Sequence, residues 1–214
     1  MNLDLIHPFV QKYAESYTSA EDALLKEIAD FTYNHHDDPQ MLSGHLQGKV
    51  LEMISCMIRP KRILEIGTFT GYSAICLAKG LAVDGQLHTI DIREADVHLA
   101  RSFFNRSINA DQIISHYGNA SDIIPKLNET WDLVFIDADK PAYIEYFNLV
   151  LPQVRENGFI LADNIFFHGG VLEENVRGKS AKGIEAFNKF IKDRTDIEKV
   201  VLTIRDGLYL IRKL

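Results

Sequence analysis

Residues 62–81 read RILEIGTFTGYSAICLAKGL, and this stretch decides the fold. A short apolar run ends at Gly67, and a segment with helical spacing starts at Gly71. A buried strand that passes through a glycine turn into a helix is typical of the start of a βαβ unit. The stretch therefore predicts a parallel sheet that is covered by helices.

The same alternation continues downstream of this stretch. Apolar runs that fit strands buried on both faces recur, with helical segments between them, and such units form right-handed crossovers. Two β-rich runs then flank Asp206-Gly207, a dipeptide that strongly favours a hairpin. The sequence thus predicts an α/β fold, a doubly wound, Rossmann-like, mostly parallel sheet with a C-terminal antiparallel hairpin. The expected strands are residues 62–67, 87–92, 113–120, 132–139 and 158–164, with the hairpin in 197–214.

The first sixty residues have helical rather than strand periodicity. One helix is expected over 19–36, with Ser19 as its N-cap, and another over 45–59, ending before Pro60. We expect a single domain over residues 1–214, in which 1–60 form an N-terminal helical cap and 61–214 the core.

The composition is that of a soluble globular protein, with 214 residues, 46% hydrophobic, 25% charged and a net charge of −7. This charge argues against nucleic acid or an anionic membrane as the main partner. No apolar run is as long as the roughly 18 residues of a membrane span, and the N-terminus lacks the pattern of a secretion signal. Cys56 and Cys76 lie in apolar surroundings, so we expect buried free thiols and a cytoplasmic location.

Ligands of open α/β sheets bind at the carboxyl ends of the strands. After the first strand, Gly67 and Gly71 allow a tight turn, but Phe69 occupies the second glycine position of a G-x-G-x-x-G motif, which disfavours a pyrophosphate site. Asp91 ends the second strand, and its carboxylate suits two ribose hydroxyls. The alternatives are a plain turn for the glycines and a helix N-cap for Asp91. The loop at Ala120 suits an adenine, or is simply a turn.

Acidic residues follow the fourth and fifth strands. Asp137 comes after the fourth, and Asp163 and Asn164 come after the fifth. If these strands are neighbours, two carboxylates and an amide meet as an all-oxygen set suited to Mg²⁺, Ca²⁺ or Mn²⁺. Each aspartate taken singly is more often a cap or turn residue. Lys140 reaches the same edge as a potential base, because a nearby cation lowers a lysine pKa; the alternative is a surface lysine.

As a set, these motifs resemble the class I S-adenosylmethionine-dependent methyltransferases. More narrowly, they resemble the cation-dependent catechol and caffeoyl-CoA O-methyltransferase family, including its bacterial members. The similarity extends from about Met41 to Leu214. The strongest matches are LEIGTFTGYSAICLA (64–78), TIDI (89–92), FIDADKPAY (135–143), ADN (162–164) and DGLYLIRK (206–213).

The resemblance implies a role for each matching residue. Lys140 falls at the position of the catalytic lysine, with Asp137 beside it, and Asp139 has no ligand role, so it faces solvent or caps the next helix. The implied metal ligands are Asp137, Asp163 and Asn164. The implied contacts to S-adenosylmethionine are Met41 near the sulfonium, Ser43, Glu65, Gly67, Thr68 and Ser73 around the methionine part, Asp91 at the ribose, Ala120 at the adenine, and Asp137.

Residues 165–183 (IFFHGGVLEENVRGKSAKG) follow Asn164 and are expected to lie over the acceptor pocket. His168 is expected to contact the acceptor together with Lys140 and Asn164, or else to face water. Phe166 and Phe167 either sandwich an aromatic ring or belong to the core. No basic cluster suits a CoA tail, which favours a free catechol-type acceptor.

The sequence therefore predicts a divalent-cation-dependent enzyme that transfers the methyl group of S-adenosylmethionine to a hydroxyl of a small vicinal dihydroxy aromatic. The alternatives are an NAD-dependent oxidoreductase, which gives Asp163 and Asn164 no role, and a non-catalytic protein that binds S-adenosylmethionine. Because relatives use extra N-terminal helices in dimer contacts, the resemblance also implies a homodimer.

Overall fold

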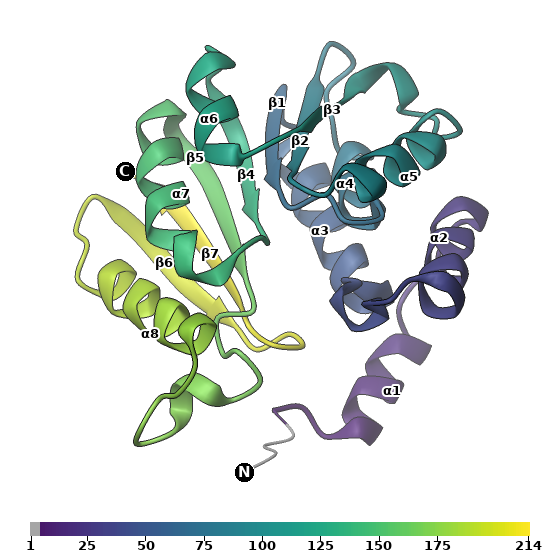
Figure 1. The fold of residues 1–214 in the computed structure, drawn as a ribbon. Helices are drawn as coiled ribbons and strands as arrows, with labels where there is room; N and C mark the ends of the chain where they lie inside the picture. Colours follow the sequence, from purple (N-terminus) through teal and green to yellow (C-terminus); the bar gives the residue numbers. More distant parts are fainter. Residues whose placement is uncertain (1–4) are drawn as a thin grey trace.

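Within residues 5–214, which the computed structural model describes, seven strands form one sheet in the order β3-β2-β1-β4-β5-β7-β6 (Figure 1). The first five strands are parallel, and β7 is antiparallel to both β5 and β6. This confirms the predicted fold class and its C-terminal hairpin. The strands are β1 (Arg62–Ile66), β2 (Gln86–Asp91), β3 (Ile113–Tyr117), β4 (Trp131–Ile136), β5 (Val154–Asp163), β6 (Ile197–Leu202) and β7 (Leu208–Lys213).

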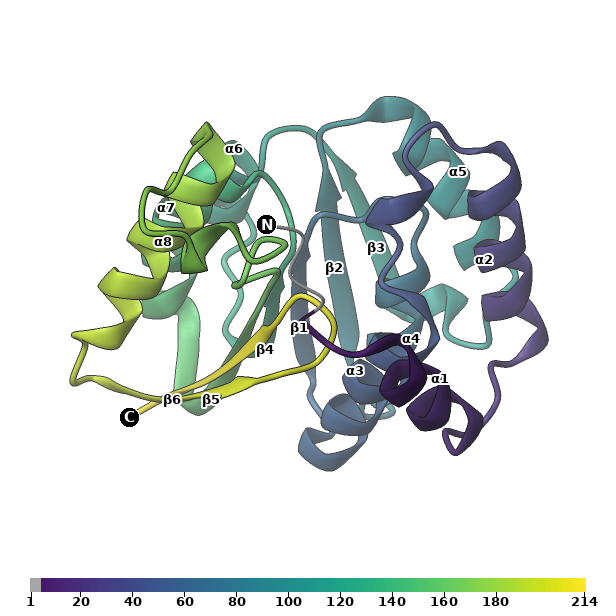
Figure 2. The same ribbon diagram turned by 90° about the horizontal axis from the view of Figure 1, so that it is seen from below.

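Helices cover both faces of the sheet (Figure 2). One layer contains α6 (Ala120–Ile123), α7 (Tyr143–Val150) and α8 (Lys179–Lys192). The other contains α2 (Ala23–His35), α3 (Gly44–Ile58), α4 (Tyr72–Ala78) and α5 (Glu94–Phe104), and α1 (Pro8–Ser16) lies beside α3. No helix among residues 5–214 combines the length and the apolar character that crossing a membrane requires.

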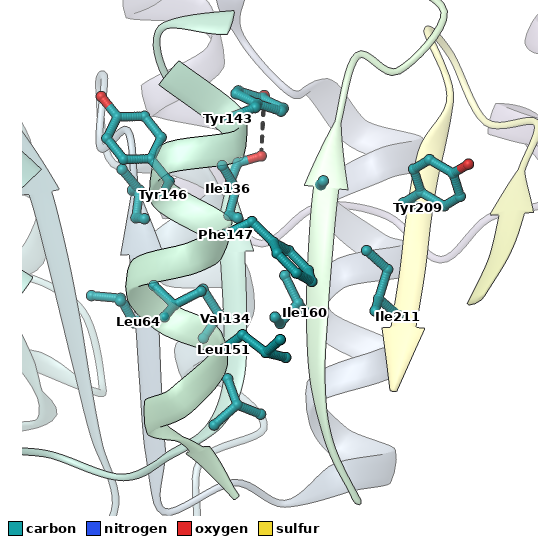
Figure 3. Close-up of a cluster of buried hydrophobic side chains, with 14 of the residues drawn as sticks. Leu64, Val134, Ile136, Tyr143, Tyr146, Phe147, Leu151, Ile160, Tyr209 and Ile211 are labelled. Carbon is teal, nitrogen blue, oxygen red and sulfur yellow. Dashed lines mark hydrogen bonds between the residues drawn. The ribbon is translucent and has the colours of Figure 1, made fainter. Parts of the chain in front are cut away.

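The core explains why the strands read as unbroken apolar runs. Along β4, Leu133 and Phe135 pack toward α3–α5, while Val134 and Ile136 pack toward α7 and α8, and all four side chains are fully buried. Figure 3 shows the second of these layers, in which aromatic side chains of α7 lie on aliphatic side chains of the sheet. Burial on both faces fixes β4 at the centre, so that its carboxyl end lies at the middle of the sheet edge.

Several predicted boundaries are wrong. The helix expected from Ser19 begins at Ala23, and its N-cap is Asp22, whose carboxylate accepts the Leu25 amide at 2.9 Å. The strand expected to extend to residue 120 ends at Tyr117. Pro141 lies in a short 3-10 turn, Lys140–Ala142, before α7 begins.

The expectation of two buried cysteines is also wrong. Cys76 is buried on α4, with its Sγ toward Gly48 of α3, but Cys56 is exposed on α3. The buried side of α3 includes Leu51 and Ile54, whereas Met53 and Met57, which flank Cys56 on the helix surface, are exposed. The apolar surroundings of Cys56 in the sequence therefore belong to an exposed helical face, not to the core.

Candidate active site

One cavity of about 880 Å³ opens at the carboxyl ends of β1, β2, β4 and β5. The cavity spans the switch point between β1 and β4, where the strand order reverses. Open α/β sheets bind their ligands at this point. All the predicted site residues except Glu65 line it, namely Met41, Ser43, Gly67, Thr68, Ser73, Asp91, Ala120, Asp137, Lys140, Asp163, Asn164 and His168.

The glycine turn after β1 brings the chain against the end of β4. Gly67 has a φ of 102°, and a Cβ on it would lie 1.9 Å from the Asp137 carbonyl oxygen. Neither the backbone angle nor the space tolerates another residue. Gly67 therefore places Asp137 directly beside the turn, and the two predicted motifs form one wall of the cavity.

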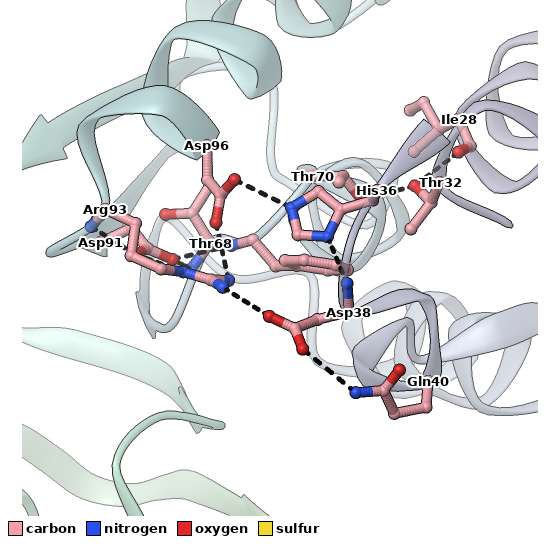
Figure 4. Close-up of polar contacts among 11 residues, drawn as sticks. Ile28, Thr32, His36, Asp38, Gln40, Thr68, Thr70, Asp91, Arg93 and Asp96 are labelled. Atoms are coloured by element: carbon pink, nitrogen blue, oxygen red, sulfur yellow. Dashed lines mark hydrogen bonds and ion pairs between the residues drawn. The ribbon is translucent and has the colours of Figure 1, made fainter. Parts of the chain in front are cut away.

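Asp91 holds the same turn from the other side (Figure 4). Its Oδ2 accepts the backbone amides of Thr68 at 3.0 Å and Phe69 at 2.8 Å, and its Oδ1 accepts the Arg93 amide at 2.9 Å. These bonds fix the carboxylate at the cavity wall. The N-cap alternative is not observed, since the N-cap position of α5 is Arg93.

Segment 36–41, which carries Met41 into the cavity, is anchored to α5. His36 Nε2 lies 3.1 Å from Asp96 Oδ1, and Arg93 pairs with Asp96 at 2.7 Å and with Asp38 at 3.6 Å (Figure 4). These contacts link the segment before α3 to the loop after β2. The cavity is therefore walled on its outer side by residues that precede the sheet in the sequence.

Glu65 lies behind the cavity and is fully buried. Its Oε2 accepts a hydrogen bond from the Thr89 hydroxyl at 2.5 Å, and its Oε1 has no hydrogen-bond partner among residues 5–214. Burial, together with the negative charges of Asp137 and Asp91, raises the pKa of Glu65 to about 8. The carboxyl group is therefore an acid at neutral pH in the cofactor-free protein.

This raised pKa predicts a pH-dependent gain in stability for Glu65→Gln. The folded pKa lies above the unfolded one, so the stability of the wild type falls as pH rises from about 4.5 to about 8. In the cofactor-free protein at pH 8, the variant is expected to be more stable by about 2–4 kcal/mol, and this gain disappears near pH 5. Urea unfolding at both pH values measures it, and a difference independent of pH would contradict the assignment.

The three residues of the metal set predicted from the sequence, Asp137, Asp163 and Asn164, all line this cavity. Asp163 Oδ2 accepts a hydrogen bond from Gln47 Nε2 at 2.7 Å, while Oδ1 is buried without a partner among residues 5–214. Burial and the charge of Asp137 raise the pKa of Asp163 to about 7. A bound cation would offset the charge of Asp137 that disfavours ionisation of Asp163, and it would give the buried Asp163 Oδ1 a partner.

The donor types fit a hard divalent cation, which prefers carboxylate and amide oxygens. The part of the chain that the structure describes contains no group of three or more His, Cys, Asp or Glu side chains able to hold a metal. A cation at this place therefore depends on the amide of Asn164 as the third protein ligand. Asn164 has a positive φ of 55°, a conformation that is uncommon outside glycine but better tolerated by asparagine.

Lys140 lies beside these carboxylates. Its Nζ is 2.7 Å from Asp137 Oδ1 and 2.8 Å from the Tyr143 hydroxyl oxygen, which in turn lies 3.2 Å from the carbonyl oxygens of Ile136 and Asp163. Burial lowers the pKa of Lys140, but the charges of Asp137, Tyr143 and Asp163 outweigh it and raise this pKa overall. Without a cation, Lys140 is therefore a charged partner of Asp137; the lowered pKa expected from the sequence presupposes a bound cation.

The segment after Asn164 forms the mouth of the cavity. The His168 amide donates to Asp206 Oδ1 at 2.6 Å, but its side chain is 82% exposed, in agreement with the alternative that it faces water. Phe167 lines the cavity, whereas Phe166 packs on the core and against Gly207. Asp139 is exposed and makes no capping hydrogen bond, so of its two expected positions it takes the solvent-facing one.

Sequence reasoning missed Gln47, Tyr143 and Arg205. Gln47 was detectable as a polar residue on the apolar face of α3, and Tyr143 follows Lys140 by three residues, one helical turn away. Arg205 extends from the β6–β7 hairpin to the cavity, and no motif in the neighbouring sequence indicates that it would reach the site.

Comparison with known proteins agrees with this geometry. A family model described as O-methyltransferase matches residues 15–214. The chain is 36% identical over 160 residues to a catechol O-methyltransferase of Niastella koreensis (73% of this chain, 72% of that protein) and 30% identical over 202 residues to caffeoyl-CoA O-methyltransferase 1 of Eucalyptus globulus (89% and 81%). The crystal structure of the O-methyltransferase TomG from Streptomyces achromogenes in complex with SAM superposes with a TM-score of 0.88 at 31% identity, covering 96% of each chain.

Proposed function

Because the chain belongs to the O-methyltransferase family and is an S-adenosylmethionine-dependent enzyme of the catechol and caffeoyl-CoA type, we propose that its acceptor is a small vicinal dihydroxy aromatic. We further propose that a divalent cation, Mg²⁺, Ca²⁺ or Mn²⁺, is held by Asp137, Asp163 and Asn164. The observation that carries this proposal is the buried Asp163 Oδ1, which has no hydrogen-bond partner among residues 5–214 and belongs to a residue that lines the same cavity as Asp137 and Lys140.

The cofactor roles are those that the family resemblance implies, and all the residues concerned except Glu65 line the cavity. Asp91, held by three backbone amides, presents its carboxylate to the ribose hydroxyls, and Ala120 borders the adenine. Met41, Ser43, Gly67, Thr68 and Ser73 surround the methionine part, with Glu65 buried behind them. When bound, S-adenosylmethionine supplies the electrophilic methyl group, so the chain itself needs only to bind and orient.

The acceptor requires ionisation, because a phenol has a pKa near 10 and is a weak nucleophile at neutral pH. When bound, a divalent cation stabilises the ionised form of a phenol. Lys140 lies at the same end of the cavity, where it can take the proton of the reacting hydroxyl, and Tyr143 holds its Nζ in place. Phe167 and Met41 contribute apolar surface around the acceptor.

The two alternative functions are less well supported. An NAD-dependent oxidoreductase gives no role to Asp163 and Asn164, and the turn at Phe69 lacks the glycine that a pyrophosphate needs. A non-catalytic protein that binds S-adenosylmethionine would not need Lys140 beside two carboxylates.

A panel of catechols tests the proposal directly. The purified protein with S-adenosylmethionine and Mg²⁺ or Mn²⁺ is expected to produce monomethylated catechols, and a chelator is expected to abolish turnover, because the two carboxylates and the amide then hold no cation. Mass spectrometry of the products measures this. In a parallel thermal-shift experiment, S-adenosylhomocysteine is expected to stabilise the protein and NAD is not; stabilisation by NAD alone, without methylation, would point to the oxidoreductase.

We also propose that the protein forms a homodimer through α1 and α3. Among residues 5–214, α1 buries none of its own side chains. Large apolar side chains on these two helices, and on the C-cap residue of α1, are exposed, namely Phe9, Tyr13, Met53, Met57 and Tyr17. Apolar side chains gathered on neighbouring helices support burial against a second copy.

A further inference from the structure

Arg205 is a cavity-lining residue without a role in the proposed reaction. It lies between β6 and β7 and extends back toward the start of α3, where its Nη1 donates to the Ser43 carbonyl oxygen and to Gln47 Oε1, the latter at 3.3 Å. Its φ of 47° is in the left-handed region, which is disfavoured for a side chain with a Cβ. The hairpin thus holds a long basic side chain in an unfavourable backbone conformation at the edge of the cavity.

The charge of Arg205 is not compensated by an acid. Of the other long basic side chains that line the cavity, Arg93 pairs with Asp96 and Lys140 pairs with Asp137. Arg205 forms no ion pair with any carboxylate of residues 5–214, and its recorded hydrogen bonds use Nη1 alone and go to neutral oxygens. Its Nη2 and Nε donors therefore have no acceptor within the described chain.

Arg205 lies at the acceptor end of the cavity rather than at the adenine end. Its neighbour Asp206 accepts the Phe166 and His168 amides, so the hairpin packs on the segment that forms the mouth. Gln47, which accepts from Arg205, donates to Asp163. A single amide side chain therefore separates the guanidinium from a carboxylate of the proposed cation site.

We infer that Arg205 binds a carboxylate carried on the ring of the acceptor, so that dihydroxybenzoic acids are preferred to neutral catechols. A guanidinium offers parallel N–H donors in a fork that matches a carboxylate, and charge-assisted bonds of this kind are stronger than neutral ones. This inference rests on the proposed function, because it assumes that a dihydroxy aromatic binds at the Asp137 and Asp163 end.

The experiment compares kcat/KM for 3,4-dihydroxybenzoate and for catechol in the wild type, Arg205→Gln and Arg205→Lys, with S-adenosylmethionine and Mg²⁺ at saturation. The wild type is expected to prefer the acid by about 10-fold or more, and Arg205→Gln to lower that ratio by about 10- to 100-fold. The ratio is the readout, because any effect of losing the bonds to Ser43 and Gln47 applies to both substrates alike. Arg205→Lys keeps the positive charge but loses the parallel N–H donors of the guanidinium. Its preference for the acid is expected to lie between those of the wild type and Arg205→Gln. If Arg205 served only to hold Ser43 and Gln47, both substrates would lose activity equally and the ratio would not move.

Arg177→Gln is the matched control. Arg177 lines a neighbouring hollow on the other side of Phe167 and His168, and its replacement is expected to leave the acid preference unchanged. Loss of the preference in this variant but not in Arg205→Gln would overturn the inference. The inference would also be overturned if Arg205→Gln lowered only the methylation of caffeoyl-CoA. That result would indicate that Arg205 binds a phosphate group of the CoA. If the wild type methylates catechol but does not prefer the acid, the inference is rejected and the proposed function stands. If the wild type methylates no acceptor, the proposed function itself is rejected.

Discussion

Asp163→Ala is expected to lower cation-dependent methylation of a catechol by at least about 100-fold, while S-adenosylhomocysteine binds with nearly unchanged affinity. The variant removes one of the two carboxylates proposed to hold the cation, and losing even an outer partner of a metal ligand costs 10- to 100-fold. The proposed cofactor contacts come from the segment before α3, the loops after β1, β2 and β3, and Asp137, and none of them is the Asp163 side chain. Initial rates with Mg²⁺ or Mn²⁺, together with calorimetric titration of S-adenosylhomocysteine, measure both quantities.

Asp139→Ala is the matched control for Asp163→Ala. Both residues line the cavity, Asp163 at the end of β5 and Asp139 shortly after β4, but Asp139 is exposed and has no proposed ligand role. Its loss is expected to change the rate by less than about 3-fold. Asp163→Asn separates folding from chemistry, since its amide oxygen can still accept from Gln47 while the charge is lost. Wild-type turnover in Asp163→Ala would show that the cation is held elsewhere.

The fold could be predicted because its signals are local. Four of the five parallel strands are apolar runs that end at or directly before Gly67, Asp91, Asp137 or Asp163, and helical segments separate the runs. Handedness and layer rules then leave few ways to arrange such units. Because the carboxyl ends of parallel strands meet at one edge of the sheet, the same pattern predicted which residues would share the cavity.

Two of the missed residues, Gln47 and Arg205, act through contacts between distant parts of the chain. Gln47 reaches Asp163 across 116 positions, and Arg205 reaches Ser43 across 162. Such contacts depend on how α3 and the β6–β7 hairpin pack around the sheet, which hydrophobic periodicity does not specify. Cys56 illustrates the same limit, because apolar neighbours in the sequence cannot distinguish the core side of α3 from its exposed side.

The charge state of Lys140 was likewise not visible in the sequence. Spacing places an amine near a carboxylate, but the balance between burial, which lowers its pKa, and the charges of Asp137, Tyr143 and Asp163, which raise it, depends on positions in space. The proposal that Lys140 takes the acceptor proton therefore needs a test that does not assume its pKa.

Lys140→Ala is expected to lower kcat by about 10²- to 10⁴-fold at pH 7, with a defect that shrinks as the pH rises toward the phenol pKa near 10. At high pH the acceptor ionises without help, so the missing base matters less. Initial rates from pH 6.5 to pH 9.5, at saturating cofactor and cation, measure the ratio between wild type and variant. Lys140→Arg distinguishes a base from a mere counter-charge, because arginine keeps the ion pair with Asp137 but does not deprotonate. A defect that stays constant across this pH range, or full rescue by arginine, would remove Lys140 from proton transfer and leave it as the partner that orients Asp137.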